Sequence, residues 1–217
     1  MSTARDAILD RIRAAKHGAI APPVPRDYRQ SDERPHAELV SLFHERVDAY
    51  KAEVERVRTD ELTAAIAAAA SRHAARRFAI PLQLPDEWRP PELELVADES
   101  LTPRELDAVD GVITGCTAAV AETGTIVLSA GPHEGRRILS LVPDLHICIV
   151  GADQVVGTVP EAIAVLAPTV RSTHHPVTLI SGPSATSDIE LQRVEGVHGP
   201  RKLVVLVIES NLTREPA

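Results

Sequence analysis

Short apolar runs alternate with amphipathic stretches along most of the chain, and this alternation predicts its elements. The runs 145–150 and 203–209 are almost continuously apolar, which is typical of strands buried on both faces of a parallel sheet. Phe43 and Val47 belong to a set of apolar residues at helical spacing, which predicts a helix that begins near residue 36. Further strands are expected over 77–81, 93–97, 111–115, 125–129 and 177–181, and further helices over 5–16, 61–72, 102–106, 135–141, 160–166 and 187–192. Strands that alternate with helices in this way indicate an α/β fold with a mostly parallel sheet.

The N-terminal part departs from this alternation. Ser2 is expected to cap the first helix. Residues 21–35 are rich in proline and in charge, and proline fixes φ and removes a backbone donor, so neither a helix nor a sheet interior fits this stretch. We therefore divide the chain into residues 1–50, which form N-terminal helices and a Pro-rich arm, and residues 51–217, which form the α/β domain.

Composition and charge narrow the class of protein. The chain has 217 residues, of which 44% are hydrophobic, and this suits a folded globular protein. Its net charge of -8 argues against a broad contact with phosphate backbones, and its few aromatic residues argue against base stacking, so we expect no nucleic-acid partner. Charge is also uneven, because residues 1–110 hold 16 basic and 21 acidic side chains and residues 111–217 hold only 7 and 10.

Neither a membrane segment nor a metal motif is evident in the sequence. No stretch approaches the roughly 20 apolar residues that a spanning helix needs, and the N-terminus lacks an apolar signal-peptide core, so we expect a cytoplasmic protein with no membrane span. Cys116 and Cys148 have apolar surroundings that predict two buried thiols, with a redox pair as the alternative. His174 and His175 are adjacent and do not match a metal-binding spacing, so no metal site is expected.

The segment 121–125 places a carboxylate, two hydroxyls and a glycine between two strand-like runs. Glu122 is a candidate general base, nucleophile or ligand-orienting acceptor, and Thr123 and Thr125 are candidate ligand contacts. Gly124 would let the backbone approach a ligand closely. The alternative is a β-turn in which the two threonines bond to the local backbone.

A second candidate site follows the strand expected over 177–181. Gly182, Ser184, Thr186 and Asp188 lie in a run of small and polar residues, where free backbone N–H groups and hydroxyl donors suit an anion. The carboxyl end of a strand is also where open α/β sheets bind their ligands. The alternative is simple helix capping by the same loop.

A histidine and an arginine complete the candidates. His198 lies between two glycines before the last expected strand and is a candidate general acid or base, with Gly199 as a ligand contact. The alternative is a turn histidine that bonds to the backbone. Arg136 opens an expected helix beside Arg137 and suits a carboxylate or a phosphate, and the alternative is an exposed basic pair.

Four motifs, taken in order, carry a resemblance to a known family. They are AETGTIVLS at 121–129, RRILSLVPDLHICIVGADQVV at 136–156, ISGPSATSDIE at 180–190 and GVHGPRKLVVLVI at 196–208. With these motifs the chain resembles the LUD domain family, and within it the lactate utilization protein C subgroup. The resemblance extends to the N-terminal part, where a leading helix, a Pro-rich arm and a second helix follow one another.

The resemblance implies a fold, a role and partners. The implied fold is a Rossmann-like α/β sandwich of the NagB/RpiA/CoA-transferase-like type. The implied role is that of a non-redox component in the oxidation of L-lactate to pyruvate. It would act beside partner subunits that carry iron–sulfur clusters, bind a small anionic ligand and hold no cofactor of its own. The cysteine count agrees with this role, because two cysteines are too few to hold a [4Fe–4S] cluster.

The same resemblance leaves an enzyme as the alternative. In related CoA-transferase-like enzymes a glutamate is the nucleophile, and Glu122 is the counterpart by analogy. The alternative function is therefore a stand-alone CoA-transferase-like or formyltetrahydrofolate cyclo-ligase-like enzyme that uses Glu122. A shared fold does not decide between these functions, because function depends on the site.

Overall fold

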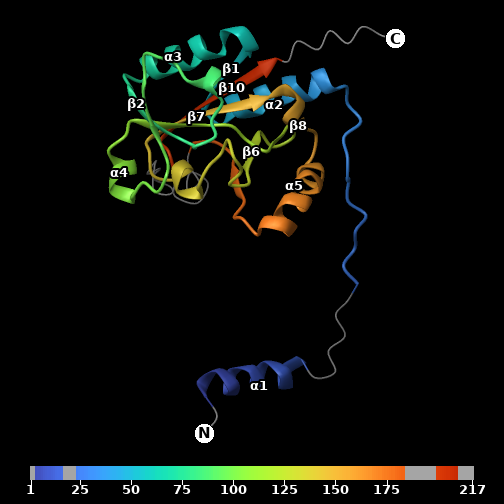
Figure 1. The fold of residues 1–217 in the computed structure, drawn as a ribbon. Coiled ribbons are helices and arrows are strands. Elements are labelled where there is room, and N and C mark those ends of the chain that lie inside the picture. The colour runs from blue at the N-terminus through green and yellow to red at the C-terminus, as the bar shows by residue number, and fades with distance from the viewer. Residues whose placement is uncertain (1–2, 17–22, 184–198, 210–217) are drawn as a thin grey trace.

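Two β-sheets packed face to face form the body of the molecule (Figure 1). The structure is a computed structural model, and it describes residues 3–16, 23–183 and 199–209. The main sheet is entirely parallel, in the order β1 (Glu53–Arg58), β10 (Lys202–Glu209), β7 (Leu145–Gly151), β4 (Gly111–Thr114), β2 (Arg77–Ile80) and β3 (Glu94–Ala97). The smaller sheet is mixed, in the order β8 (Val155–Val156), β5 (Ala118–Val120), β6 (Thr125–Leu128) and β9 (Thr178–Ile180).

Helices cover both outer faces of this sandwich. α3 (Leu62–Arg72) packs on one face of the main sheet, whereas α2 (His36–Ala49) and the smaller sheet pack on the other. α5 (Val159–Thr173) covers the outer face of the smaller sheet, and the short α4 (Pro103–Asp107) packs beside β2 and β4. No helix in the described part of the chain is long and apolar enough to cross a membrane.

The central strands are buried on both faces. In β7, Ile147 packs with α3 and Cys148 packs with the opposite cluster, and neither side chain is exposed. Successive side chains of a strand point to opposite faces, so a strand covered on both sides must be apolar at every position. This two-sided burial explains the continuous apolar runs of β7 and β10.

The first helix stands apart from the body. α1 (Ala4–Lys16) has no buried residue, and it lies at a distance from the two sheets (Figure 1). Its cap is Thr3, whose backbone N–H donates to the Asp6 carboxylate at 3.0 Å while the Asp6 N–H donates to the Thr3 hydroxyl at 3.3 Å. The expected cap, Ser2, lies outside the described residues. Residues 23–35 form neither helix nor strand, which confirms the expected arm over its described part.

The α/β class and the mostly parallel sheet are confirmed, and several elements differ from expectation. β5 and β8 are not predicted by the pattern, because strands of 3 and 2 residues are too short to show a period. The helix expected over 135–141 is a 3₁₀ helix over Arg137–Ser140. α5 continues beyond its expected end because Leu166 and Val170 still pack on the smaller sheet. The helix expected over 187–192 lies outside the described residues.

α2 belongs to the core of the body. Its residues Phe43 and Val47 are buried against the main sheet, and α2 also contacts β8 of the smaller sheet. The expected division at residue 50 assigns α2 to the N-terminal part, and this division stays a prediction.

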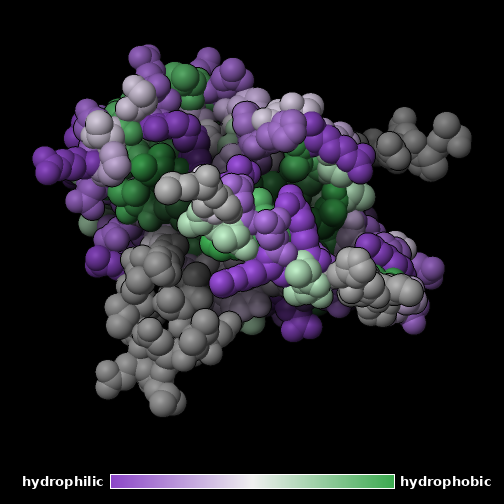
Figure 2. Space-filling view, turned by 90° about the horizontal axis from the view of Figure 1, so that it is seen from below, coloured by the Kyte–Doolittle hydropathy of each residue, from purple (hydrophilic) through white to green (hydrophobic). Residues whose placement is uncertain are grey.

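The surface combines polar side chains with apolar recesses. On the face shown in Figure 2, hydrophobic side chains lie in recesses between hydrophilic ones. Leu82 is 55% exposed, and a single exposed apolar side chain is ordinary by itself. Leu82, however, borders the largely apolar cavity that follows.

Candidate functional site

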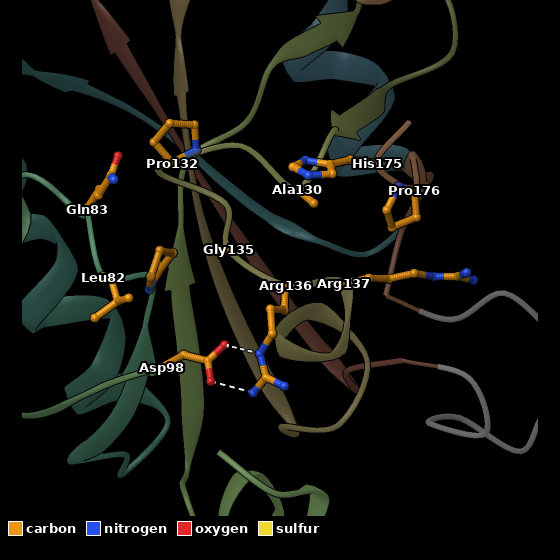
Figure 3. A pocket seen from close by; sticks show the side chains of 11 residues that line it. Leu82, Gln83, Asp98, Ala130, Pro132, Gly135, Arg136, Arg137, His175 and Pro176 are labelled. Carbon is orange, nitrogen blue, oxygen red and sulfur yellow. Dashed lines mark hydrogen bonds and ion pairs between the residues drawn. The ribbon is translucent and has the colours of Figure 1, made fainter. Parts of the chain in front are cut away.

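A cavity of about 400 Å³ opens at the carboxyl edge of the main sheet (Figure 3). Its lining residues 81–83 directly follow β2, Asp98 directly follows β3, and further lining residues come from the loop 130–137 that follows β6. In open α/β sheets, ligands bind beyond the carboxyl ends of the strands. The cavity is therefore the place at which this fold is expected to hold a ligand.

An ion pair forms one side of the cavity. Arg136 Nε donates to Asp98 Oδ2 at 2.8 Å, and Arg136 Nη2 donates to Asp98 Oδ1 and to the carbonyl oxygen of Leu101. The Asp98 side chain is only 1% exposed. Burial raises the pKa of Asp98, but hydrogen bonds from Arg136 and from the Leu101 N–H outweigh burial and hold this pKa below its usual value. Asp98 is therefore ionised at neutral pH and fixes the Arg136 guanidinium.

Arg137 supplies the uncompensated charge among the described residues that line the cavity. It extends away from Asp98, on the side of Pro176 (Figure 3), and no ion pair joins it to another residue within the described ranges. Arg136 is neutralised by Asp98, although its Nη1 makes no hydrogen bond to any residue that the structure describes. Besides the His175 imidazole, the lining residues that the structure describes thus carry one net positive charge, which suits a monoanion.

A buried glutamate holds the loop that carries both arginines. Glu134 is 5% exposed, and its Oε2 accepts hydrogen bonds from the backbone N–H groups of Ser129 at 2.6 Å and of Gly131 at 2.8 Å. The hydroxyls of Ser129 and Thr117 also donate to this carboxylate. One carboxylate therefore links three places by hydrogen bonds: Ser129 at the start of the loop, Gly131 within it and Thr117 before β5.

The hairpin turn between β5 and β6 holds the first predicted site. Glu122 forms an ion pair with Arg29 of the N-terminal arm at 2.6 Å, and its side chain is 48% exposed. Gly124 has a φ of 61°, and a Cβ at this position would lie 2.8 Å from the Cβ of Arg46. The close approach that Gly124 permits is thus to helix α2.

Hydroxyl groups connect this turn to the loop after β9. Thr123 Oγ1 lies 2.7 Å from Thr125 Oγ1, which in turn lies 2.8 Å from Ser181 Oγ. The threonines therefore bond to side chains. Gly182 follows in the left-handed region, with a φ of 90°, and packs against Tyr50. The structure thus brings the segment 122–125 and the start of the second candidate loop together.

The other predicted site residues that the structure describes, Arg136 and Gly199, lie away from the turn 122–125. Arg136 lies in the loop after β6, whereas Glu122 lies in the turn before it, so the strand separates them. Gly199 lies shortly before β10, at the amino edge of the main sheet, whereas the cavity lies at the carboxyl edge. Four predicted site residues lie outside the described residues: Ser184, Thr186, Asp188 and His198.

The sequence pattern does not predict that Asp98, Glu134 and His175 belong to the site. Asp98 carries a usable signal, because it directly follows a strand of the main sheet and ligand sites favour that position. Glu134 carries no such signal, because its donors come from segments that only the fold brings together. His175 lines the cavity because β9 pairs with β6, a contact between distant segments.

Two thiols lie in contact inside the sandwich. Cys116 and Cys148 are both buried, as expected. Hydrogen bonding with Cys116 lowers the pKa of Cys148, with further lowering by His146 and Thr114, whereas burial acts in the opposite direction. The same hydrogen bond raises the pKa of Cys116. In the described part of the chain, no group of three or more His, Cys, Asp or Glu side chains could hold a metal ion.

The wild-type protein is expected to show thiolate absorbance in the ultraviolet that rises at a lower pH than that of an ordinary thiol, because the pKa of Cys148 is lowered. Cys148→Ser should remove this rise, and Cys116→Ala should move its midpoint upward because the neighbour that lowers the pKa of Cys148 is lost. A midpoint that is unchanged in Cys116→Ala would contradict the assignment. A titration of the unfolded protein in urea, which should give an ordinary thiol pKa, is the control.

Known proteins resemble this chain along most of its length. The model of the LUD domain matches residues 40–208. Lactate utilization protein C of Deinococcus radiodurans is 47% identical over 173 residues, which cover 79% of this chain and 80% of that protein. Lactate utilization protein C of Halalkalibacterium halodurans is 27% identical over 191 residues, with 79% and 80% covered.

A solved structure shows the same fold. The crystal structure of a DUF162 family protein from Deinococcus radiodurans matches with a TM-score of 0.70 and 38% sequence identity, over 81% of this chain and 99% of that chain. The resemblance expected from the four motifs is confirmed, and the chain is a homologue of lactate utilization protein C. Because the domain match spans well over half of its residues, the chain belongs to the LUD domain family.

Proposed function

We propose that this chain is a non-redox component of L-lactate utilization, which takes part in the oxidation of L-lactate to pyruvate beside iron–sulfur partner subunits. The observation that carries this proposal is the 47% identity to lactate utilization protein C of Deinococcus radiodurans. The cysteine count supports the non-redox role, because Cys116 and Cys148 alone cannot hold a [4Fe–4S] cluster. We further assign the sandwich to the NagB/RpiA/CoA-transferase-like type and the protein to the cytoplasm.

In this role the cavity at the carboxyl edge is the proposed site of an anionic ligand. Arginine recognises a carboxylate through paired N–H donors, and Arg136 Nη1 and the Arg137 guanidinium are the donors available here. Asp98 holds Arg136 in place before the ligand arrives, so binding does not have to order this side chain.

The geometry favours this proposal over an enzyme that uses Glu122 as a nucleophile. A nucleophilic carboxylate needs an oxygen that is free to attack and a cavity that brings the substrate to it. The Glu122 carboxylate is instead paired with Arg29, and Glu122 does not line the cavity of Figure 3. Mutation of Glu122 is therefore expected to leave the role in lactate utilization intact.

Deletion of the gene in its native host is expected to prevent growth on L-lactate as the sole carbon source, while growth on pyruvate continues. A tagged full-length chain should restore growth and should co-purify with proteins that contain iron and acid-labile sulfide. The Glu122→Gln variant is the matched test of the alternative and should restore growth as well as the wild type.

Two results would overturn the proposed function. One is a deletion strain that grows normally on L-lactate. The other is a tagged chain that restores growth without retaining any iron–sulfur protein, because the role beside such partners would then be wrong. Growth that requires an intact Glu122 would instead favour the enzyme.

A further inference from the structure

The cavity is much larger than lactate. Its volume of about 400 Å³ lies in the range of roughly 300 to 1,000 Å³ in which proteins hold drug-sized ligands. At about 30 Å³ for each water molecule, a three-carbon acid would leave most of this space to solvent. A ligand that fills the cavity therefore has a body well beyond the size of lactate.

The walls of the cavity are suited to an apolar body. Pro81, Leu82, Pro132 and Pro176 line it, and Leu82 leaves more than half of its side chain in water at this place. Each methylene group that a ligand buries against such walls strengthens binding by roughly fourfold. The apolar lining thus favours a hydrocarbon body, and the Gln83 amide is the polar group on this side of the cavity.

The charge of the cavity is suited to a single anionic group. Asp98 neutralises Arg136 and leaves Arg137 as the uncompensated cation of the lining, as far as the structure describes it. Both arginines come from the same end of the loop 130–137, whereas Leu82 comes from the segment after β2 (Figure 3). A ligand therefore meets a cationic side and an apolar side in one cavity.

We propose that this cavity binds an amphiphilic monoanion, with a carboxylate held at Arg137 and an aliphatic body larger than lactate against Leu82 and the prolines. The proposal rests on the anionic-ligand site of the proposed function and specifies the class of ligand that this site takes. Saturated carboxylates of about six to ten carbons are the simplest members of this class, and they fit a volume of this order.

Titration calorimetry of the full-length chain with sodium hexanoate, sodium octanoate, octanamide and L-lactate tests the proposal. Octanoate is expected to bind roughly 15-fold more tightly than hexanoate, because it buries two more methylene groups. Octanamide, which has the same body without the charge, should bind more weakly, and L-lactate should give no saturable heat. Trp88 is the only tryptophan of the chain, so its fluorescence provides a second readout.

Three variants locate the binding. Arg137→Gln should weaken octanoate binding at least about tenfold and leave octanamide binding unchanged, because it removes only the partner of the charge. Leu82→Ser should weaken both ligands. Arg171→Gln, which removes an exposed arginine of α5 that does not line the cavity, is the matched control and should change neither.

The inference is overturned if L-lactate binds as tightly as octanoate or if no member of the series binds. It is also overturned if the affinity for octanoate is unchanged in both Arg137→Gln and Leu82→Ser. None of these outcomes bears on growth or co-purification, so the proposed function would stand. A failure of growth or co-purification would likewise leave the calorimetric result as it is.

Discussion

Replacement of Glu134 by alanine is expected to lower the free energy of unfolding by about 3–5 kcal/mol, since it leaves several buried donors without a partner. The carboxylate accepts from two backbone N–H groups and from the hydroxyls of Ser129 and Thr117, and almost none of it is exposed. Hydrogen bonds to a charged acceptor are worth about 1.5–3 kcal/mol each and are not additive. For a chain of this length the melting temperature should fall by about 10 °C.

The size of this loss depends on hydrogen bonding rather than on charge alone, and Glu134→Gln separates the two. The amide oxygen of glutamine can accept from the N–H groups of Ser129 and Gly131, while its NH₂ can donate to the Thr117 hydroxyl. Glu134→Gln should therefore lose only about 1–2 kcal/mol. Glu92→Ala, on the exposed turn before β3, is the control and should stay within about 0.5 kcal/mol of the wild type. Urea unfolding measures all three, and equal losses for alanine and glutamine would contradict the role of Glu134.

The central strands of the main sheet are predictable because burial on two faces leaves a local trace. β7 and β10 must be apolar at every position, and a continuous apolar run is visible without knowledge of their neighbours. The short strands β5 and β8 of the smaller sheet leave no such trace. Val156 of β8 pairs with Val120 of β5, so these strands are stabilised by partners that lie far away in the sequence.

The candidate site shows the same limit. Residue types alone select the Arg136–Arg137 pair, and both arginines line the cavity. The pattern cannot distinguish their roles, because the difference is made by Asp98, which lies 38 residues upstream and reaches only Arg136. The hydroxyls at 123 and 125 are likewise visible as a motif, but their link to Ser181 depends on the pairing of β6 with β9.

The ion pair between Arg136 and Asp98 leads to a second large effect. Arg136→Met removes the partner of a carboxylate that is 1% exposed, and breaking a buried pair costs about 3–5 kcal/mol. Because the arginine side chain is 48% exposed, part of this interaction is screened by solvent, so a loss of about 2–3 kcal/mol is expected at neutral pH. Arg137→Met is the matched control and should cost less than about 0.5 kcal/mol, since no ion pair involving Arg137 is present among the described residues.

The pH dependence of this loss identifies Asp98 as its cause. In the wild type the pKa of Asp98 lies below its usual value of 3.8, so its contribution is present above pH 4 and is lost only as the pH falls through the lower folded pKa. Without Arg136, burial becomes the dominant influence and raises the pKa of Asp98 above 3.8. A raised carboxyl pKa destabilises the fold as the pH rises, so the gap between Arg136→Met and the wild type should widen from pH 4 to pH 7.

Urea unfolding of both proteins at several pH values between 4 and 7 measures this gap directly, and other carboxylates cancel in the difference. The double variant Asp98→Ala with Arg136→Met has no carboxylate at position 98, so its gap to the wild type should stay nearly constant above pH 4. If the Arg136→Met gap is equally constant, the loss comes from the packing of the arginine side chain and Asp98 is not the group that Arg136 keeps ionised. A gap that widens only in the single variant shows that the cavity carries a preformed, charge-neutral pair, with Arg137 left as the cation that meets a ligand.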